Sequence, residues 1–294
     1  MSENVVSFEA FETDAQIASH QKGLIRIILE GNTDVELFQR FWFLDRLDVF
    51  EFVEARSFVE GSGCTGVISG VAKCKQQGIP AMGILDRDIL FRNKNWDLLF
   101  SLDANALNSD ANAAGIYVAS RWEVEAYLLE ADSRLSDWVS VEYLPPPGPE
   151  HICKKALPAI LQSCEDLLWT ASFFASKHEA GQATNERMFY DRPLPEIQAA
   201  CKAQQVTLNG VPKQVAARVE ILVDAIRLAQ PREDVDRLPF LLRYVDTKRL
   251  LKRLGHVLGI RDNFWFLASL MMRVGQRPAE FDQLLSKVET RFSN

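Results

Sequence analysis

Apolar residues follow two different spacings in the first half of the chain. Four short segments have the length of strands: three are runs rich in apolar residues, and the second alternates apolar and polar residues. Between the first three of them, apolar residues recur every three or four positions, which is typical of helices. This alternation predicts an α/β fold, with a parallel sheet, right-handed crossovers and flanking helices. The expected strands are 24–29 (LIRIIL), the stretch beginning at Phe50 and Phe52, 81–85 (AMGIL) and 115–119 (GIYVA).

Local signals place the helices between these strands. Thr33 followed by Glu36 matches a capping box, in which both side chains satisfy backbone donors at a helix start. Residues 61–63 (GSG) interrupt the chain before a second helix at about 65–77, which Gly78 closes. The first helix is expected to carry its apolar face on Val35, Phe38, Phe41 and Leu44.

A proline-rich segment at 144–149 (LPPPGP) separates two regions of different pattern. Consecutive prolines form a stiff, extended spacer. We therefore expect an α/β domain at residues 1–143 and an α-helical domain at residues 150–294. Before the spacer, the small, polar stretch 101–114 predicts a long loop over the carboxyl edge of the sheet. After it, single helix faces are predicted by Val215, Val219, Leu222 and Ile226, and by Phe281, Leu284, Leu285, Val288 and Phe292.

Composition narrows the classes of protein to consider. The apolar share of 47% and charged share of 25% match an ordinary globular protein. No run approaches the ~20 apolar residues of a membrane span, and no basic stretch precedes an apolar core at the N-terminus, so we expect a cytoplasmic protein. The five cysteines form no C-x-x-C pair and the four histidines are scattered, which excludes a zinc site of the usual spacing. We expect reduced, structural cysteines.

The net charge of −7 is unevenly divided. Residues 1–150 hold 12 Lys/Arg and 24 Asp/Glu, whereas residues 151–294 hold 21 Lys/Arg and 16 Asp/Glu. An acidic half beside a basic half suits carboxylates gathered around a metal, with a separate surface for a polyanion. Uneven decoration of the surface accounts for the same numbers, and charge alone does not separate the two readings.

Four acidic residues stand just after the predicted strands. Glu30 directly follows the first strand, and Asp86 and Asp88 follow the third. Glu125 lies just beyond the fourth strand. Since the carboxyl ends of adjacent parallel strands converge on one crevice, these carboxylates should lie close together and repel one another. A hard cation resolves that conflict, and ligands that are all oxygen suit Mg²⁺ or Mn²⁺.

Structural roles for the same residues stay open at this point. Glu30 could be an acid that favours a helix start, and Asp86 and Asp88 could form a turn. Asp34 could orient the site or cap the helix. The 61–63 segment could offer backbone donors to a phosphate or be a plain loop.

Three motifs together resemble a known family. They are LEGNTD at 29–34, LDRD at 85–88 and EAYLL at 125–129, the last with Ala126 where the family has Asn. The first two resemble the glutamate and Asp-x-Asp motifs of Toprim domains. The set is similar to the Toprim-like nucleases of phage-defence loci, which are related to the overcoming-lysogenization-defect nucleases and include AriB of the PARIS system. The resemblance covers about residues 22–130 and, more weakly, DTKRLL at 246–251, where Thr247 replaces a Gly.

The resemblance implies a function and a set of site residues. The chain would be a magnesium-dependent nuclease and a toxic anti-phage effector, controlled by an ABC-type ATPase partner; it could also form a homodimer. Asp86 and Asp88 would ligate one or two metals, Glu30 would be a ligand or the general base, and Glu125 a further ligand. The substrate could be DNA or RNA, with transfer RNA implied by the likeness to AriB.

The second half offers a candidate nucleic-acid surface. Leu250, Leu251 and Leu254 occupy one face of a predicted helix. The other face is either solvated or contacts phosphates, since clustered basic side chains supply most non-specific affinity for nucleic acid. Its basic residues are Lys248, Arg249, Lys252 and Arg253.

Two rival functions remain. In the first, the chain is a non-catalytic Toprim-like adaptor that docks onto an ATPase assembly through its helical half, where residues 264–267 (FWFL) form core or interface. In the second, it is a primase-like polymerase. The absence of a zinc ribbon argues against the second.

Overall fold

The computed structural model describes most of the chain, which divides into two compact units. Unit 1 comprises residues 1–86, 108–119 and 271–294, and unit 2 comprises residues 87–107 and 120–270. The described residues are 23–57, 63–103, 105–108, 115–129, 149–183, 189–190, 192–205, 207–259 and 264–293.

Unit 1 is built on a four-stranded parallel sheet with the order β2-β1-β3-β4. The apolar runs form these strands because their β-branched and aromatic side chains fit a pleated, buried surface. β1 is buried along its whole length. The strands are β1 (Ile25–Leu29), β2 (Phe50–Glu54), β3 (Ala81–Leu85) and β4 (Ile116–Val118), so all four predicted strands are confirmed.

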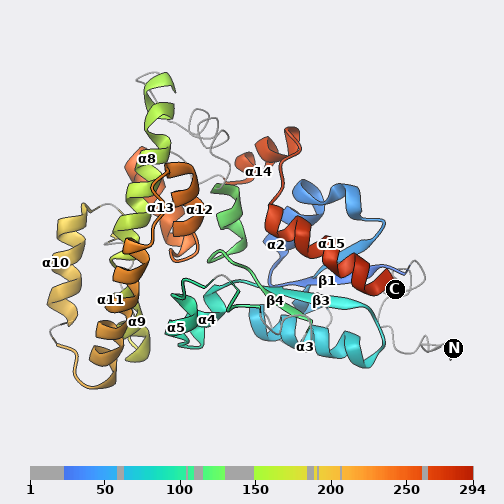
Figure 1. Cartoon of the computed structure of the whole chain (residues 1–294), viewed down its shortest axis with the longest axis horizontal. Helices are drawn as coiled ribbons and strands as arrows, with labels where there is room; N and C mark the ends of the chain where they lie inside the picture. The colour runs from blue at the N-terminus through green and yellow to red at the C-terminus, as the bar shows by residue number, and fades with distance from the viewer. Residues whose placement is uncertain are drawn as a thin grey trace. The chain divides into compact units, whose positions relative to one another are not determined.

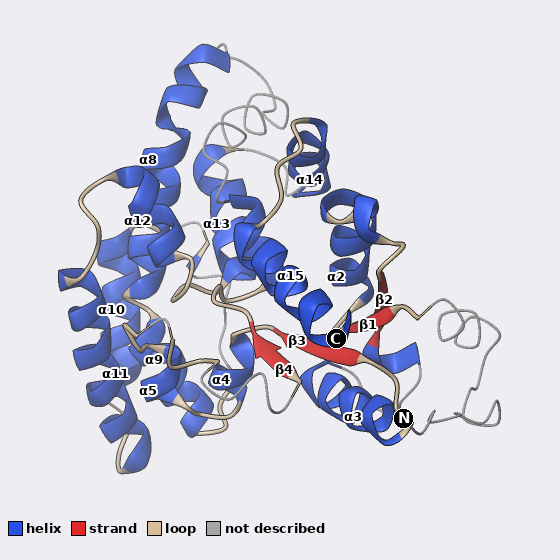
Figure 2. Cartoon of the chain, turned by 45° about the vertical axis from the view of Figure 1, so that its right-hand side comes forward, coloured by secondary structure: helices blue, strands red, loops and turns tan. Residues whose placement is uncertain are grey.

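Helices cover both faces of this sheet, and the expected α/β architecture is confirmed. α3 (Gly63–Gln76) lies against one face, and α2 (Asn32–Glu36) and α15 (Ala279–Ser293) lie over the other (Figures 1 and 2). Gly78 follows the end of α3 and has a left-handed φ of 67°, which favours glycine. Gly83 of β3 lets α3 approach, because a Cβ there would stand 2.5 Å from Val67 Cγ1.

The helix predicted after β1 takes a different form. α2 passes directly into a π-helical segment at Leu37–Trp42, and a 3-10 turn follows at Leu44–Arg46. The wider turn shifts the buried face to Leu37, Phe38, Trp42 and Phe43, while Leu44 is 61% exposed. The predicted capping box is also wrong: Gly31 is the N-cap, and the Asp34 carboxylate accepts from the Gly31 amide.

Aromatic rings join this segment to the C-terminal helix. Phe38 and Phe281 have ring centroids 4.8 Å apart, and Trp42 stacks on Phe281 at 6.1 Å. An ion pair between Arg46 and Glu289 adds a second link. The last helix of the chain is therefore part of the sheet unit.

Unit 2 is almost entirely helical. α9 packs along α11, and α8 packs against α12 and α13. A buried ion pair between Asp166 of α8 and Arg253 of α13 ties two of these helices together. The main helices are α8 (Pro149–Leu168), α9 (Ala171–Glu179), α10 (Leu194–Gln205), α11 (Val211–Leu228), α12 (Asp234–Leu241) and α13 (Thr247–Leu258). The shorter elements are α4 (Asp88–Arg92), α5 (Trp96–Leu99) and the 3-10 helix η5 (Val124–Leu129); α14 (Phe264–Arg273) spans the division between the units.

These units differ from the two consecutive domains expected at 1–143 and 150–294. Two segments of the first half belong to unit 2, and residues 271–294 belong to unit 1. Residues 144–148 of the expected spacer lie outside the described residues, and Pro149 begins α8. Of the expected 101–114 loop, residues 101–103 and 105–108 are described, and the Asn108 side chain bonds the backbone of Val118 in β4.

Candidate metal centre

Glu30 and Asp86 meet at the carboxyl edge of the sheet. Glu30 follows β1 and Asp86 follows β3, and these strands are neighbours. The Asp86 amide donates to Glu30 Oε1 at 3.0 Å. The Asp86 side chain is buried, with 7% of its surface exposed. The predicted convergence of these two residues is therefore observed within unit 1.

Asp88 completes a group of three carboxylates. It begins α4, two residues along the same turn from Asp86. Glu30, Asp86 and Asp88 each present one oxygen, and the three oxygens lie within 4.8 Å of one another. Such a set of oxygen donors is the kind that hard divalent cations bind.

Asp88 has an unsatisfied oxygen. Oδ2 accepts from Arg92 Nη2 at 2.5 Å, whereas Oδ1 is buried and has no hydrogen-bond partner among the described residues. Burial raises the pKa of Asp88 above its ordinary value, and the nearby charges of Arg92 and Lys248 lower it in part. A buried carboxylate oxygen without a hydrogen-bond partner is energetically unfavourable, and a bound cation would stabilise it.

Glu125 does not join this group. It is buried in η5 at 8% exposure, and its carboxylate is outside the set that lies within 4.8 Å. The α/β pattern placed Glu125 correctly after β4 in the chain. Its expected role as a metal ligand therefore has no support in this arrangement.

Glu123, which the sequence interpretation overlooked, is the more perturbed acid. It is 4% exposed and accepts from the Lys248 amide at 3.1 Å and from Lys248 Nζ at 2.8 Å. Burial, together with the negative charge of Asp246, raises the pKa of Glu123 to about 8. The only sequence signal was the Glu-x-Glu spacing at 123–125, because the partner Lys248 lies 125 positions away.

Arg87, between the two aspartates, points away from them. It is fully buried and donates to the backbone oxygens of Leu99, at 3.1 Å from Nε, and Ser120, at 3.3 Å. Burial, the main cause, and the nearby positive charges of Arg243 and Arg121 lower its pKa to about 10. Carbonyl groups of unit 2 therefore hold Arg87 in place within that unit.

The predicted basic face of α13 is divided by burial. Arg253 is 4% exposed and bonds Asp166 and the carbonyl oxygens of Phe189 and Arg192. It holds the fold together and does not face solvent. Arg249 pairs with Asp246 at 2.9 Å and lies 3.7 Å from the Phe174 ring centroid.

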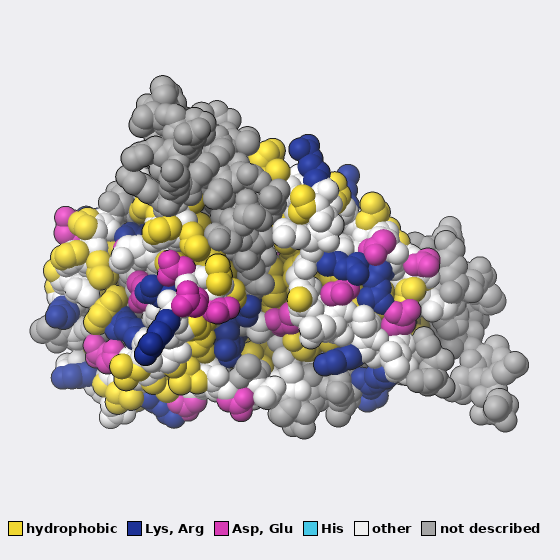
Figure 3. All heavy atoms as spheres, turned by 45° about the horizontal axis from the view of Figure 1, so that its top comes forward, with side chains coloured by type: hydrophobic (Ala, Val, Ile, Leu, Met, Phe, Trp, Pro, Cys, Tyr) yellow, Lys and Arg dark blue, Asp and Glu magenta, His cyan; other side chains and the backbone are white. Residues whose placement is uncertain are grey.

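The exposed basic side chains of α13 are Lys248 and Lys252. Lys252 Nζ stands 5.5 Å from the Tyr190 ring centroid, and Lys248 is held by Glu123. On the face drawn in Figure 3, positive and negative side chains are interspersed. Whether Lys248 or Lys252 contacts nucleic acid stays a prediction.

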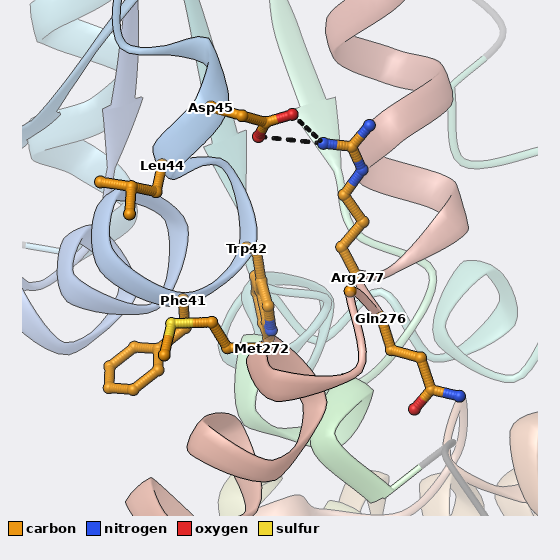
Figure 4. A pocket seen from close by; sticks show the side chains of 8 residues that line it. Phe41, Trp42, Leu44, Asp45, Met272, Gln276 and Arg277 are labelled. Carbon is orange, nitrogen blue, oxygen red and sulfur yellow. Dashed lines mark hydrogen bonds and ion pairs between the residues drawn. The ribbon is translucent and has the colours of Figure 1, made fainter.

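A separate groove of about 480 Å³ lies in unit 1 (Figure 4). Phe41, Leu44 and Met272 give it apolar walls, and an ion pair of Asp45 and Arg277 stands at one side, 3.0 Å between Oδ2 and Nη1. The Trp42 indole N–H is buried there without an acceptor among the described residues. None of the metal-centre carboxylates lines it.

The other residues that the sequence singles out are those of the 61–63 segment, Asp34 and the cysteines. Gly61 and Ser62 lie outside the described residues, so their expected phosphate contact stays a prediction. Asp34 caps α2 through Gly31, as one of its two expected roles required. Cys74, Cys164 and Cys201 are buried and unbridged.

Comparison with known proteins gives no assignment. No family model matches the chain, and neither the curated proteins nor the solved structures contain a significant match. Within the described residues, no helix has both the length and the apolar content that crossing a membrane requires.

Proposed function

We propose that this chain is a Toprim-like nuclease that uses a divalent cation to cleave phosphodiester bonds in nucleic acid. The observation that carries the proposal is the grouping of Glu30, Asp86 and Asp88 after neighbouring parallel strands. The order of the EGxxD and DRD motifs, and their resemblance to the Toprim-like family, support the same reading.

The chemistry follows from the residues at this edge of the sheet. Asp86 and Asp88 would hold Mg²⁺ or Mn²⁺, and Glu30 would be a further ligand or accept a proton from the attacking water. When bound, the cation polarises a phosphoryl oxygen and lowers the pKa of a coordinated water. Lys248 places an exposed positive charge near Asp88, where a substrate phosphate would need one.

The biological setting is proposed from the resemblance alone. The chain would act as a toxic effector in phage defence, held inactive by an ABC-type ATPase partner until infection. Its substrate would be RNA, including transfer RNA, or DNA. We expect the isolated chain to have weak activity, because effectors of this kind depend on an assembly.

Metal binding is the first test. Titration of the full chain with Mn²⁺ by calorimetry should reveal binding that the Asp86→Asn/Asp88→Asn double variant loses. Asp236→Asn removes an exposed acid from α12 and should bind Mn²⁺ like the parent chain. Equal binding by parent and double variant would place the cation elsewhere.

Cleavage is the second test. Glu30→Gln keeps the size of the side chain and its ability to accept from Asp86, but the amide cannot take a proton or bind a cation as a carboxylate does. It should therefore abolish toxicity on expression and cleavage of RNA or DNA, at an unchanged melting temperature. If the parent chain binds Mn²⁺ but neither it nor its assembly cleaves nucleic acid, the adaptor function replaces the nuclease function.

A further inference from the structure

α11 carries apolar side chains on two opposite sides. The buried residues of the side that packs along α9 are Val219, Val223 and Ile226. On the other side, Ile221 is 71% exposed and Leu228 is 90% exposed. Ala217 is exposed on this side too, since positions 217, 221 and 228 recur at the spacing of one helix face. These three residues form an exposed apolar stripe, a feature that often marks a surface for another molecule.

A groove of about 450 Å³ adjoins the apolar stripe. It lies in unit 2 between α10 and α11, which are side by side (Figures 1 and 2). The buried side chain of Leu208 contributes to its floor, and Ala217 belongs both to the groove and to the stripe. Lys213 and Glu220 line it from α11. The groove has the volume to receive apolar side chains from another molecule.

Two opposite charges of this groove are not neutralised within the chain. Lys213 and Glu220 are exposed, and neither side chain forms an ion pair among the described residues. Other charged residues of α11 are paired, Arg218 with Asp97 and Arg227 with Asp224. Positions 213 and 220 are two helical turns apart, about 10 Å along one side of α11. The surface therefore has a positive end and a negative end.

This arrangement of charge is self-complementary. When two copies of α11 lie antiparallel, Lys213 of each copy meets the partner's Glu220, and a two-fold axis makes the contact occur twice. The midpoint between positions 213 and 220 falls at Ala216 and Ala217. Their small side chains let two helices approach closely. A second copy of the chain therefore matches both the charge and the shape of this surface.

Other occupants match the surface less well. A polynucleotide would be repelled by Glu220 and would leave Ile221 without an apolar contact. An acidic peptide would pair with Lys213 but would meet the same repulsion at Glu220. A second copy satisfies both charges and also covers the apolar stripe.

We propose that two copies of this chain associate through α11, antiparallel and about a two-fold axis near Ala217. Burial of the apolar stripe drives the association. The charges set its orientation, because a parallel arrangement would place Lys213 against Lys213 and Glu220 against Glu220. The interface rests on residues of unit 2 alone and does not depend on the proposed nuclease function.

Sedimentation velocity of the full chain at rising micromolar concentrations tests the interface. The parent chain should show a monomer–dimer equilibrium, and a chain that stays monomeric throughout would overturn the proposal. Lys213→Glu and Glu220→Lys each place like charges opposite one another twice, so each should weaken dimerisation by roughly 10- to 100-fold. Lys75→Glu makes the same charge change at an exposed position of α3 and should dimerise like the parent chain.

Mixing the two variants decides whether these residues meet each other. A Lys213→Glu chain and a Glu220→Lys chain offer opposite charges at both contacts, so they should form a heterodimer with about the affinity of the parent dimer. The double variant Lys213→Glu/Glu220→Lys should dimerise again for the same reason. Dimers that survive both single changes, or a mixture that associates no better than either variant alone, would overturn the α11 interface.

Two controls separate this interface from folding and from the metal centre. Both α11 positions are exposed, so the single variants should keep the melting temperature of the parent monomer at low concentration. The Asp86→Asn/Asp88→Asn variant should dimerise like the parent chain, whether or not it binds Mn²⁺. Loss of dimerisation in that variant would contradict an interface confined to α11 and its groove.

Discussion

At the residue scale, Arg253 shows that the spacing of basic residues along a helix does not reveal which of them are exposed. The i, i+4 pattern grouped it with Lys248, Arg249 and Lys252 as a basic face. In the fold, its guanidinium is enclosed by Asp166 and two carbonyl groups. The acid is 87 positions away, so local periodicity could not reveal the pair. A basic residue next to the apolar face of a helix can be buried and stabilise the fold when it pairs with a carboxylate that is distant in the sequence.

Arg253→Ala should therefore be strongly destabilising. Removing one partner of a buried ion pair leaves an uncompensated charge, which costs about 3–5 kcal/mol. Urea unfolding of the full chain should show this loss. The matched change Lys252→Ala, at the exposed neighbouring position, should stay within about 0.5 kcal/mol of the parent. Comparable losses in both variants would contradict the buried pair.

Some basic residues of α13 are buried and others are exposed, so a test of nucleic-acid binding should change an exposed one. Lys252→Glu reverses an exposed charge without touching Asp166 or Glu123. It should weaken binding of RNA or DNA about equally for all sequences, and it should flatten the salt dependence. Filter binding across a range of salt concentrations measures both effects. Parallel slopes with equal affinities would mean that Lys252 is only a solvated side chain.

Glu123 should make stability depend on pH. Its pKa is about 8 in the folded chain and 4.5 ordinarily, so the folded state holds the proton more tightly than the unfolded state does. This contribution is complete below 4.5 and is lost as pH rises through about 8. The difference in unfolding free energy between the parent chain and Glu123→Gln should change over that window. A constant difference across the window would show that burial does not raise the pKa of Glu123.

At the element scale, the strands could be predicted and the first helix could not. Three of the predicted strands are short, continuous apolar runs, and the second was predicted because apolar and polar residues alternate from Phe50. The stretch 33–44 has the apolar spacing of a regular helix, but the structure departs from that period. A π-helical segment adds residues to a turn, so Phe41 and Leu44 leave the face that Phe38 buries. In this geometry Phe38 packs against Phe281 of α15, a contact between distant parts of the chain that local spacing cannot reveal.

Gly83 should be intolerant of even a methyl group. Its backbone is in β3, where a Cβ would approach Val67 Cγ1 at 2.5 Å and Ile116 Cδ1 at 2.9 Å. Gly83→Ala should cost about 1–3 kcal/mol, because a well-packed interface must shift to accept it. Gly31→Ala is the control, since its nearest atom stands 3.8 Å away. Thermal unfolding of both variants compares the two sites directly, and a similar melting temperature would mean that α3 is loosely packed.

At the scale of the whole molecule, each compact unit is assembled from segments that are separated in the sequence. The proline-rich segment at 144–149 predicts consecutive domains, since such a segment is a common linker. The chain instead leaves the sheet unit after Asp86, returns at Asn108, leaves again after Ala119 and returns at Met271. The pairing of Glu30 with Asp86 does not depend on this division, because it needs only two neighbouring strands of one sheet.

The C-terminal helix should be essential to the sheet unit. Phe281 is fully buried against Phe38 and Trp42, so Phe281→Ala should cost about 3–5 kcal/mol. Val274→Ala, at a half-exposed position in the same segment, should have little effect. A fragment of residues 1–143 should accordingly bind a hydrophobic dye and unfold without a cooperative transition. Cooperative unfolding of that fragment would mean that α15 is dispensable.

The return of α15 to the sheet has a consequence for how the protein is made. Arg46 and its partner Glu289 are 243 positions apart, so all the residues between them must leave the ribosome before the pair can form. Chains fold largely as they emerge, and helical segments with local contacts fold fastest. Unit 2 can thus mature during translation, while the aromatic face of the sheet waits for the last helix. The aromatic face of the sheet would therefore stay uncovered in a nascent chain until residues 279–293 have emerged.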